Sequence, residues 1–227
     1  MSARVVPDGD EGRAAAIETL RAGGIVALPT DTVYGIAVAL GTPGGVERLF
    51  RAKERPPDRG IMLLLDDAAQ AAAIGVMGPA ASALAAAFWP GGLTVVVPQR
   101  PDVPLPAVLT GGAATIGLRV PDHAAPRALA AAVGPLPTTS ANVSGLPEAH
   151  DAAEILAQLG EAVDLILDGG PAQGGLASTV VDCSGARPVI LREGAIPTSR
   201  VARVLDAAGV THEVRARQRG PASRPTR

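Results

Sequence analysis

Cysteine and histidine are scarce in this sequence of 227 residues, which limits the kinds of site that it can hold. Cys183 is the single cysteine, so the chain can form no internal disulfide and no cysteine-based zinc site. His123, His150 and His212 are widely separated and include no HExxH pair, so they do not indicate a metal centre. If the protein uses a metal ion, the sequence does not reveal its ligands.

Long hydrophobic runs are also missing. Stretches such as Ile61–Leu65 fall far short of the roughly 18 residues that a membrane-spanning helix needs. Residues 1–13 are polar and contain no apolar segment typical of a signal peptide. We therefore expect a cytoplasmic protein that does not associate with a membrane.

Three common active-site motifs do not occur. The sequence has no GxxxxGK[ST] phosphate loop, no GxGxxG after its first apolar strand and no GxSxG nucleophile elbow. These gaps argue against a P-loop nucleotide-binding protein, an ordinary dehydrogenase and an esterase.

Lysine is nearly missing, because Lys53 is the single lysine among 20 basic residues. An ammonium group and a planar guanidinium are not interchangeable, so Lys53 could mark a position where arginine would not serve. Chance survival of one lysine in an arginine-rich chain is an equally good explanation.

Charge is unevenly distributed along the chain. Residues 213–227 contain five arginines and one glutamate, a net charge of +4, which leaves −6 on residues 1–212 of a chain that carries −2. The composition, 47% hydrophobic and 19% charged, is typical of a compact globular protein. We predict one domain over residues 1–212 and an arginine-rich, disordered tail over residues 213–227.

Segments with strand and helix periodicity alternate through this domain. We expect strands at residues 24–28, 33–40, 61–65, 93–97, 116–120, 136–139, 165–167, 179–181 and 189–191, and helices at 11–21, 43–53, 67–74, 79–88, 124–132, 152–159 and 198–208. The alternation predicts an α/β fold whose sheet is covered on at least one side. The strands after residue 160 leave little room for crossovers, which favours some antiparallel pairing.

Polar clusters lie at the ends of several expected elements. They are PTDTVYG at 29–35, KERPPDR at 53–59, TIGLRVP at 115–121, PTTSANVSG at 137–145, DGGPAQGGLASTVVD at 168–182 and LREGAI at 191–196. Hydroxyls, amides and carboxylates at strand ends can bind a small polar ligand, and arginines held in a rigid loop can bind phosphate. Turns, helix capping and exposed strand ends explain each cluster about equally well when it is taken alone.

The order and spacing of these clusters resemble those of the YrdC-like family. The similarity runs from about residue 10 to about residue 208, and its most specific part is the combination of Lys53, Arg55, Ser140 and Asn142. It implies an α/β fold in which a twisted mixed sheet with flanking helices surrounds a large concave cavity lined by positive charge. A doubly wound Rossmann sheet is not expected.

The resemblance also implies a reaction. Bacterial single-domain members of the family make L-threonylcarbamoyladenylate and pyrophosphate from L-threonine, bicarbonate or CO2, and ATP, with Mg²⁺ assisting. A separate transferase uses that product to modify tRNA, and a direct contact between this chain and tRNA is a further expectation.

Site residues follow from the same resemblance. Lys53 and Arg55 would be catalytic residues that contact the triphosphate of ATP. Thr32, Arg119 and Ser178 would bind L-threonine. Further contacts with ATP would come from Arg59, Thr115, Ser140, Asn142 and Arg192.

Several positions depart from the family pattern. Ala177 stands where the family often has glutamate, and Arg59 stands where a small polar residue or lysine is common. Leu64 and Leu65 replace a polar or histidine side chain that is frequent there. These differences concern the pockets expected for threonine and phosphate.

Two other interpretations stay open. One is a YrdC-like enzyme that forms carbamoyl-adenylate, as in hydrogenase maturation proteins, although the zinc-finger and acylphosphatase modules of those proteins do not occur in this sequence. The other is a non-catalytic RNA-binding protein, which the charge of −6 on residues 1–212 disfavours.

Overall fold

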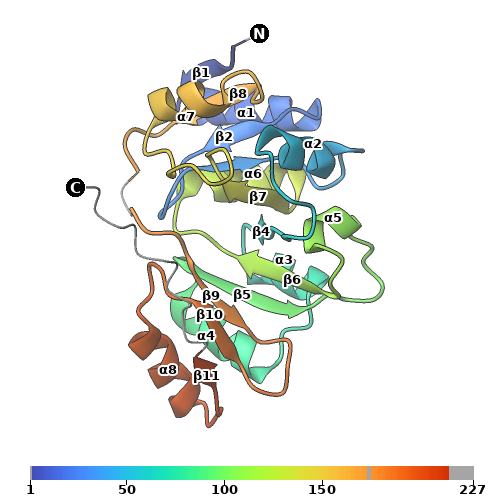
Figure 1. The fold of residues 1–227 in the computed structure, drawn as a ribbon, viewed down its shortest axis with the longest axis vertical. Helices are drawn as coiled ribbons and strands as arrows, with labels where there is room; N and C mark the ends of the chain where they lie inside the picture. The colour runs from blue at the N-terminus through green and yellow to red at the C-terminus, as the bar shows by residue number, and fades with distance from the viewer. Residues whose placement is uncertain (1, 173–174, 215–227) are drawn as a thin grey trace, which may run out of the picture.

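The structure is a computed structural model that describes residues 2–172 and 175–214, and in this part of the chain eleven strands form one β-sheet (Figure 1). The strands are β1 (Arg4–Pro7), β2 (Val26–Leu28), β3 (Gly35–Ala37), β4 (Met62–Leu64), β5 (Leu93–Pro98), β6 (Thr115–Arg119), β7 (Leu136–Ser140), β8 (Leu165–Asp168), β9 (Thr179–Asp182), β10 (Val189–Arg192) and β11 (Glu213–Val214).

The sheet is mixed, with the strand order β1-β8-β2-β3-β7-β4-β6-β5-β9-β10-β11. Neighbours are parallel at β1/β8, β8/β2, β4/β6, β5/β9 and β10/β11, and antiparallel at the other five steps. The predicted mixed α/β class is therefore confirmed.

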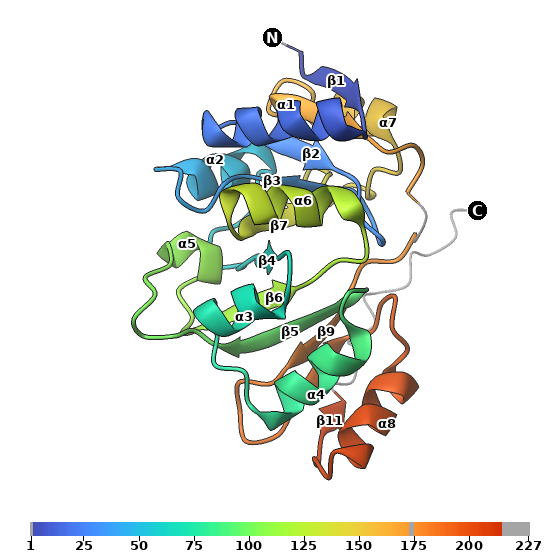
Figure 2. The ribbon, with the colours of Figure 1, turned by 180° about the vertical axis from the view of Figure 1, so that it is seen from behind.

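Helices cover both faces of the sheet. They are α1 (Asp10–Arg21), α2 (Gly45–Ala52), α3 (Ala68–Ile74), α4 (Pro79–Phe88), α5 (Ala107–Thr110), α6 (Ala124–Val133), α7 (Ala152–Leu159) and α8 (Thr198–Ala207). Helices α1 and α6 lie side by side over one face, as Figure 2 shows, and α7 packs against β8 on the other. Helices α4 and α8 pack together at the opposite end of the molecule.

The apolar stripes of these helices explain how they dock. Ala16 and Leu20 of α1 and Leu129 and Ala130 of α6 belong to one fully buried cluster with residues of β2, β7 and β8. Residues four positions apart lie on the same side of a helix, as Ala16 and Leu20 do on α1 and Ala125 and Leu129 do on α6. None of the helices in the described residues is long and apolar enough to cross a membrane.

Most predicted elements are present, and the differences lie at the sheet edges, in one loop and in α5, a helix of four residues that the sequence did not predict. β1 and β11 are edge strands that the sequence did not predict, and each is too short to show a clear periodicity. The strand expected at residues 33–40 is only Gly35–Ala37, because residues 29–34 form a loop. The antiparallel pairing predicted after residue 160 occurs between β9 and β10, whereas β8 and β9 also have parallel neighbours.

The predicted tail overlaps the sheet at its start. Glu213 and Val214 pair in parallel with β10, so the sheet extends two residues beyond the expected boundary at residue 212. The remainder of the predicted tail, residues 215–227, lies outside the described residues.

Candidate active site

One cavity of about 340 Å³ lies against a face of the central strands. Its volume falls within the roughly 300–1,000 Å³ that small-molecule sites occupy. Side chains of a β-strand alternate between the two faces of the sheet, so every second residue points into the cavity. This alternation brings in Met62 and Leu64 of β4, Thr94 and Val96 of β5, Thr115, Gly117 and Arg119 of β6, Thr138 and Ser140 of β7, and Ser178 and Val180 at β9.

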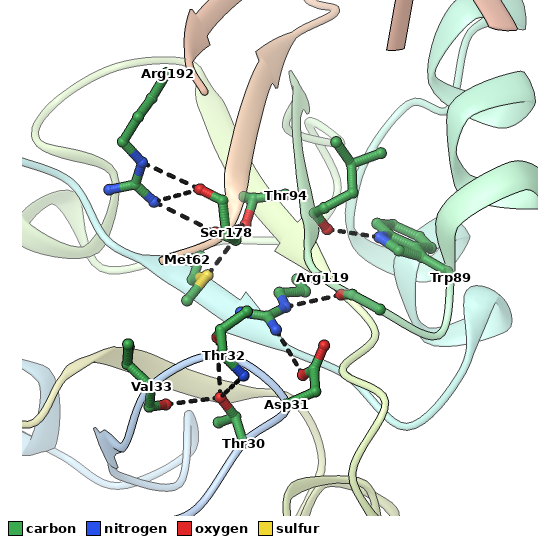
Figure 3. Close-up of polar contacts among 12 residues, drawn as sticks. Thr30, Asp31, Thr32, Val33, Met62, Trp89, Thr94, Arg119, Ser178 and Arg192 are labelled. Atoms are coloured by element: carbon green, nitrogen blue, oxygen red, sulfur yellow. Dashed lines mark hydrogen bonds and ion pairs between the residues drawn. The ribbon is translucent and has the colours of Figure 1, made fainter. Parts of the chain in front are cut away.

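Arg119 is the most deeply buried charge in this wall, with only 1% of its surface exposed. It is the last residue of β6, and its guanidinium reaches the loop after β2 (Figure 3). Nη2 donates to Asp31 Oδ1 at 2.6 Å, Nη1 donates to Thr32 Oγ1 at 2.9 Å, and Nε donates to the carbonyl oxygen of Gly91 at 3.0 Å. The two loops at residues 29–34 and 89–92 are thus joined through one side chain.

Arg119 carries a buried positive charge that Asp31 balances. Burial lowers its pKa, while the neighbouring carboxylate of Asp31 acts in the opposite direction. Because an arginine stays protonated in proteins, the guanidinium is a permanent cation on the cavity wall. Its planar array of donors matches the geometry of a carboxylate.

A pair of threonine hydroxyls lies beside this guanidinium. Thr30 Oγ1 and Thr32 Oγ1 are 3.0 Å apart, and Thr30 also donates to the carbonyl oxygen of Val33 at 2.6 Å. The backbone N–H of Thr32 donates to Thr30 Oγ1 at 3.1 Å, which closes a tight turn. Both threonines line the cavity.

Ser178 and Arg192 meet on the opposite wall. Arg192, the last residue of β10, donates through Nε and Nη2 to the carbonyl oxygen of Ser178 at 3.1 and 2.8 Å, and through Nη2 to its hydroxyl at 3.3 Å. The Ser178 hydroxyl lies 2.8 Å from that of Thr94, which also contacts Met62 Sδ at 3.4 Å (Figure 3). The hydroxyl of Ser178 is therefore fixed between two strands.

Trp89, the single tryptophan, follows the last residue of α4 (Figure 3). Its indole Nε1 donates to the carbonyl oxygen of Leu93 at 2.8 Å, next to Thr94 in β5. Gly91, whose carbonyl oxygen accepts from Arg119, lies two residues further along the same turn.

Lys53 lies inside the wall, where only 2% of it is exposed. Its ammonium donates to the backbone carbonyl and, at 3.3 Å, the hydroxyl of Ser140, and to the carbonyl and Oδ1 of Asn142 at 2.6 and 3.0 Å. Ser140 in turn donates to Asn142 Oδ1 at 2.6 Å. Desolvation and the nearby positive charge of Arg55 lower the pKa of Lys53 to about 8, although Glu148 acts against them.

Arg55 is held by the loop that follows it. Its Nε and Nη2 donate to the carbonyl oxygens of Arg59 and Gly60, both at 2.9 Å, and its guanidinium lies 5.9 Å from the ring centre of Phe50. Burial and the charge of Arg59 lower its pKa. Arg55 lines the cavity, as does Glu148 from the loop after β7.

The ten residues predicted for the site therefore divide into two groups. Seven line the cavity: Thr32, Arg55, Thr115, Arg119, Ser140, Ser178 and Arg192. Lys53 and Asn142 lie behind this lining and are hydrogen bonded to the Ser140 side chain. Arg59 is exposed, and its carbonyl oxygen accepts a hydrogen bond from Arg55. A direct contact of Lys53, Asn142 or Arg59 with a nucleotide stays a prediction.

Some residues in or beside the cavity wall were not predicted. Thr94 is the only polar residue of β5 at residues 93–98, and that isolated hydroxyl in an apolar strand was a usable signal. Asp31 was visible as an acid between two threonines, but its pairing with Arg119 depends on the fold. Among the positions that differ from the family pattern, Ala177 and Leu64 line the cavity and Leu65 is fully buried.

The acidic residues do not form a resident metal centre in the described part of the chain. No group of three or more His, Cys, Asp or Glu that could hold a metal ion occurs there, and Glu148 is the only acid among the described lining residues. Mg²⁺ usually keeps several waters and binds through one or two carboxylates together with substrate phosphates. Within the described lining, Glu148 supplies one carboxylate of the kind that Mg²⁺ binds.

Fold and cavity together define an α/β protein with a cavity lined by arginines and hydroxyls. Three arginines and one glutamate line the cavity within the described chain. The sequence model of the Sua5/YciO/YrdC family, described as "Telomere recombination", matches residues 18–194. The chain belongs to this family.

Relatives and a solved structure support the same placement. A protein of Mycobacterium tuberculosis (strain CDC 1551 / Oshkosh) is 39% identical over 202 residues, which are 88% of this chain and 92% of that protein. The threonylcarbamoyl-AMP synthase of Bacillus subtilis (strain 168) is 37% identical over 196 residues, 85% of this chain and 56% of that protein. The crystal structure of P. abyssi Sua5 complexed with L-threonine matches with a TM-score of 0.84 and 31% identity, over 93% of this chain and 62% of that one.

Proposed function

We propose that this protein is an L-threonylcarbamoyladenylate synthase, a nucleotidyltransferase that converts L-threonine, bicarbonate or CO2, and ATP into threonylcarbamoyl-AMP and pyrophosphate. The observation that carries the proposal is the convergence of Thr32, Arg119, Ser178, Arg192 and Arg55 on one cavity. Relatives named threonylcarbamoyl-AMP synthase cover most of the chain and support it.

The reaction makes two demands on such a cavity. The amine nitrogen of threonine attacks the carbon of CO2 and loses a proton, which gives a carbamate. A carbamate oxygen then attacks the α-phosphorus of ATP, and the bond to the bridging oxygen breaks as pyrophosphate leaves. Both reacting groups are anionic, so catalysis depends on positioning and on neutralising charge.

The described side chains can divide this work. Arg119 would take the carboxylate of threonine, with Thr32 and Ser178 beside it. Arg55 and Arg192 would neutralise the phosphates, and Ser140 and Thr115 would line the adenylate pocket. Lys53 and Asn142 would act by holding Ser140 in place, since their polar atoms are hydrogen bonded to it.

Mg²⁺ would enter as part of the ATP substrate, and Glu148 is the cavity carboxylate available to its water shell or to the ion itself. The product would pass to a transferase that modifies tRNA, and we place this sequence of reactions in the cytoplasm, where ATP and tRNA are available. Contact between this chain and tRNA belongs to the same proposal.

The test is pyrophosphate release by the purified protein with ATP, Mg²⁺, bicarbonate and L-threonine. We expect release that requires both threonine and bicarbonate. Arg55→Ala should lower kcat/KM for ATP by about 10²–10³-fold if Arg55 stabilises the transition state. Arg100→Ala is the control, because Arg100 pairs with the exposed Asp102 and does not line the cavity.

Two other results would contradict the proposal. Pyrophosphate formed without threonine, or equally well with carbamoyl phosphate, would indicate a carbamoyl-adenylate-forming enzyme. No turnover, together with salt-sensitive tRNA binding that is lost on deleting residues 215–227, would indicate a non-catalytic RNA-binding protein.

A further inference from the structure

Thr30 has a hydroxyl whose hydrogen-bonding capacity is completely used inside the protein. A hydroxyl has one hydrogen to donate and two lone pairs to accept with. The carbonyl oxygen of Val33 can only accept, and it lies 2.6 Å from Thr30 Oγ1, so the Thr30 hydrogen points at Val33. The Thr32 backbone N–H at 3.1 Å and the Thr32 hydroxyl at 3.0 Å then supply the two hydrogens that Thr30 accepts.

This arrangement fixes the direction of the hydrogen bond between the two threonine side chains. Because the hydrogen of Thr30 is committed to Val33, Thr32 must be the donor in the Thr30–Thr32 pair. Thr32 Oγ1 also accepts a hydrogen bond from Arg119 Nη1 at 2.9 Å. In the described part of the chain this leaves Thr32 with one lone pair, and Thr32 lines the cavity. Toward a ligand, Thr32 is therefore an acceptor only.

An acceptor in this position favours a ligand group that carries a hydrogen. In the proposed function, on which this inference rests, the amine of threonine becomes the carbamate that turns toward ATP, and Arg119 takes the carboxylate. The remaining polar group of threonine is its β-hydroxyl. A site that hydrogen-bonds a substrate hydroxyl discriminates strongly against an analogue that lacks it, because the buried partner is then left unpaired.

We propose that Thr30 is a positioning residue that holds Thr32 as an acceptor for the β-hydroxyl of the amino-acid substrate, and so sets the preference for threonine over its deoxy analogue. Thr30 acts through Thr32 and need not touch the substrate. A valine at position 30 keeps the shape of the side chain but removes the acceptor, which releases the Thr32 hydrogen to point elsewhere.

The experiment compares L-threonine with L-2-aminobutyrate, which is threonine without its hydroxyl. Dissociation constants of both are measured for the wild type, Thr30→Val and Thr30→Ser, together with kcat and KM for threonine and ATP. We expect Thr30→Val to reduce the preference for threonine by about tenfold, mainly through a higher KM for threonine, with the KM for ATP unchanged. Thr30→Ser, which retains the hydroxyl, should restore the preference.

Thr19→Val is the matched control, since Thr19 donates to the carbonyl oxygen of Ala15 within α1 and lies outside the cavity. Thermal unfolding of each variant separates a local effect from misfolding. An equal loss of affinity for both ligands in Thr30→Val, an unchanged preference, or failure of Thr30→Ser to rescue would overturn the inference. A wild type that releases pyrophosphate but does not prefer threonine would overturn the inference alone, whereas a wild type that forms no product with threonine would overturn the proposed function.

Discussion

Lys53 occupies a position whose contacts suit a lysine better than an arginine. Its ammonium is surrounded by four oxygen atoms of Ser140 and Asn142. A compact ammonium can donate in three directions from one point, whereas a guanidinium is a flat, extended group that does not fit the same space. The survival of a single lysine in an arginine-rich chain therefore has a structural explanation.

The lowered pKa of Lys53 predicts a pH dependence of stability. Folded Lys53 loses its proton at about pH 8, compared with an ordinary value of 10.5. Between these values the unfolded chain binds more protons, so the free energy of unfolding should rise with pH, by roughly 3 kcal/mol in total. Urea unfolding from pH 7.5 to 11 should show this rise in the wild type relative to Lys53→Met. A constant difference between the two proteins across this window would contradict the assignment.

At the residue scale, the sequence could indicate the chemistry of the site but not its contacts. Seven of the ten predicted side chains line the cavity, and three do not. That Asp31 neutralises Arg119, or that Lys53 supports Ser140, depends on contacts between residues 87 or more positions apart. Local sequence carries no signal for such pairs.

The segments around β9 and β10 show how an element can hold two site residues in register. Thr179 Oγ1 donates to the carbonyl oxygen of Ile196 and accepts from the N–H groups of Gly194 and Ile196. These bonds draw the end of β10 against the start of β9. As a result the Arg192 guanidinium remains hydrogen bonded to the carbonyl oxygen of Ser178.

A substitution of Gly194 tests how closely the chain after β10 approaches residues 177–179. An added Cβ would overlap the carbonyl oxygen of Ala177 and lie 2.7 Å from the carbonyl group of Ser178. We predict that Gly194→Ala destabilises the fold by about 1–3 kcal/mol and raises the KM for threonine several-fold, since Ser178 must move. Gly41→Ala is the control, because nothing lies within 4 Å of its added Cβ. Unaltered kinetics in Gly194→Ala would show that this contact does not position Ser178.

At the element scale, periodicity located most strands and helices but not their partners. Runs such as 61–65 and 93–97 are apolar enough to be recognised, whereas β1 and β11 pair along only four and two residues. The order of strands in a sheet depends on which faces are buried together. Because the apolar strands of this chain are similar, their sequences are compatible with many different orders.

At the scale of the whole molecule, strands of opposite direction contribute residues to the site. Thr32 follows the end of β2, and Arg119 ends β6, which is four positions away in the sheet and runs antiparallel to β2. Neighbouring strands twist by about 20–25°, so four steps rotate the sheet by about a right angle. In the folded sheet Arg119 Nη1 lies 2.9 Å from Thr32 Oγ1, a contact that no single segment of sequence encodes.

A site assembled from residues 30 to 192 exists only in the folded chain, so ligands should stabilise the whole sheet. At a concentration of ATP one hundred times its Kd, the free energy of unfolding should rise by about 2.7 kcal/mol. Denaturant unfolding with and without ATP and Mg²⁺ measures this shift. Arg55→Ala should show a smaller shift at the same ATP concentration, and an equal shift would argue that ATP binds away from Arg55.

The position of Trp89 has a practical consequence. The molecule has one indole, which is hydrogen bonded beside Thr94 and sits in the turn whose backbone also restrains the Arg119 guanidinium. Any rearrangement of that turn changes the surroundings of a single fluorophore. Unlabelled protein thus carries one intrinsic optical probe, and its emission reports on this turn free of interference from a second tryptophan.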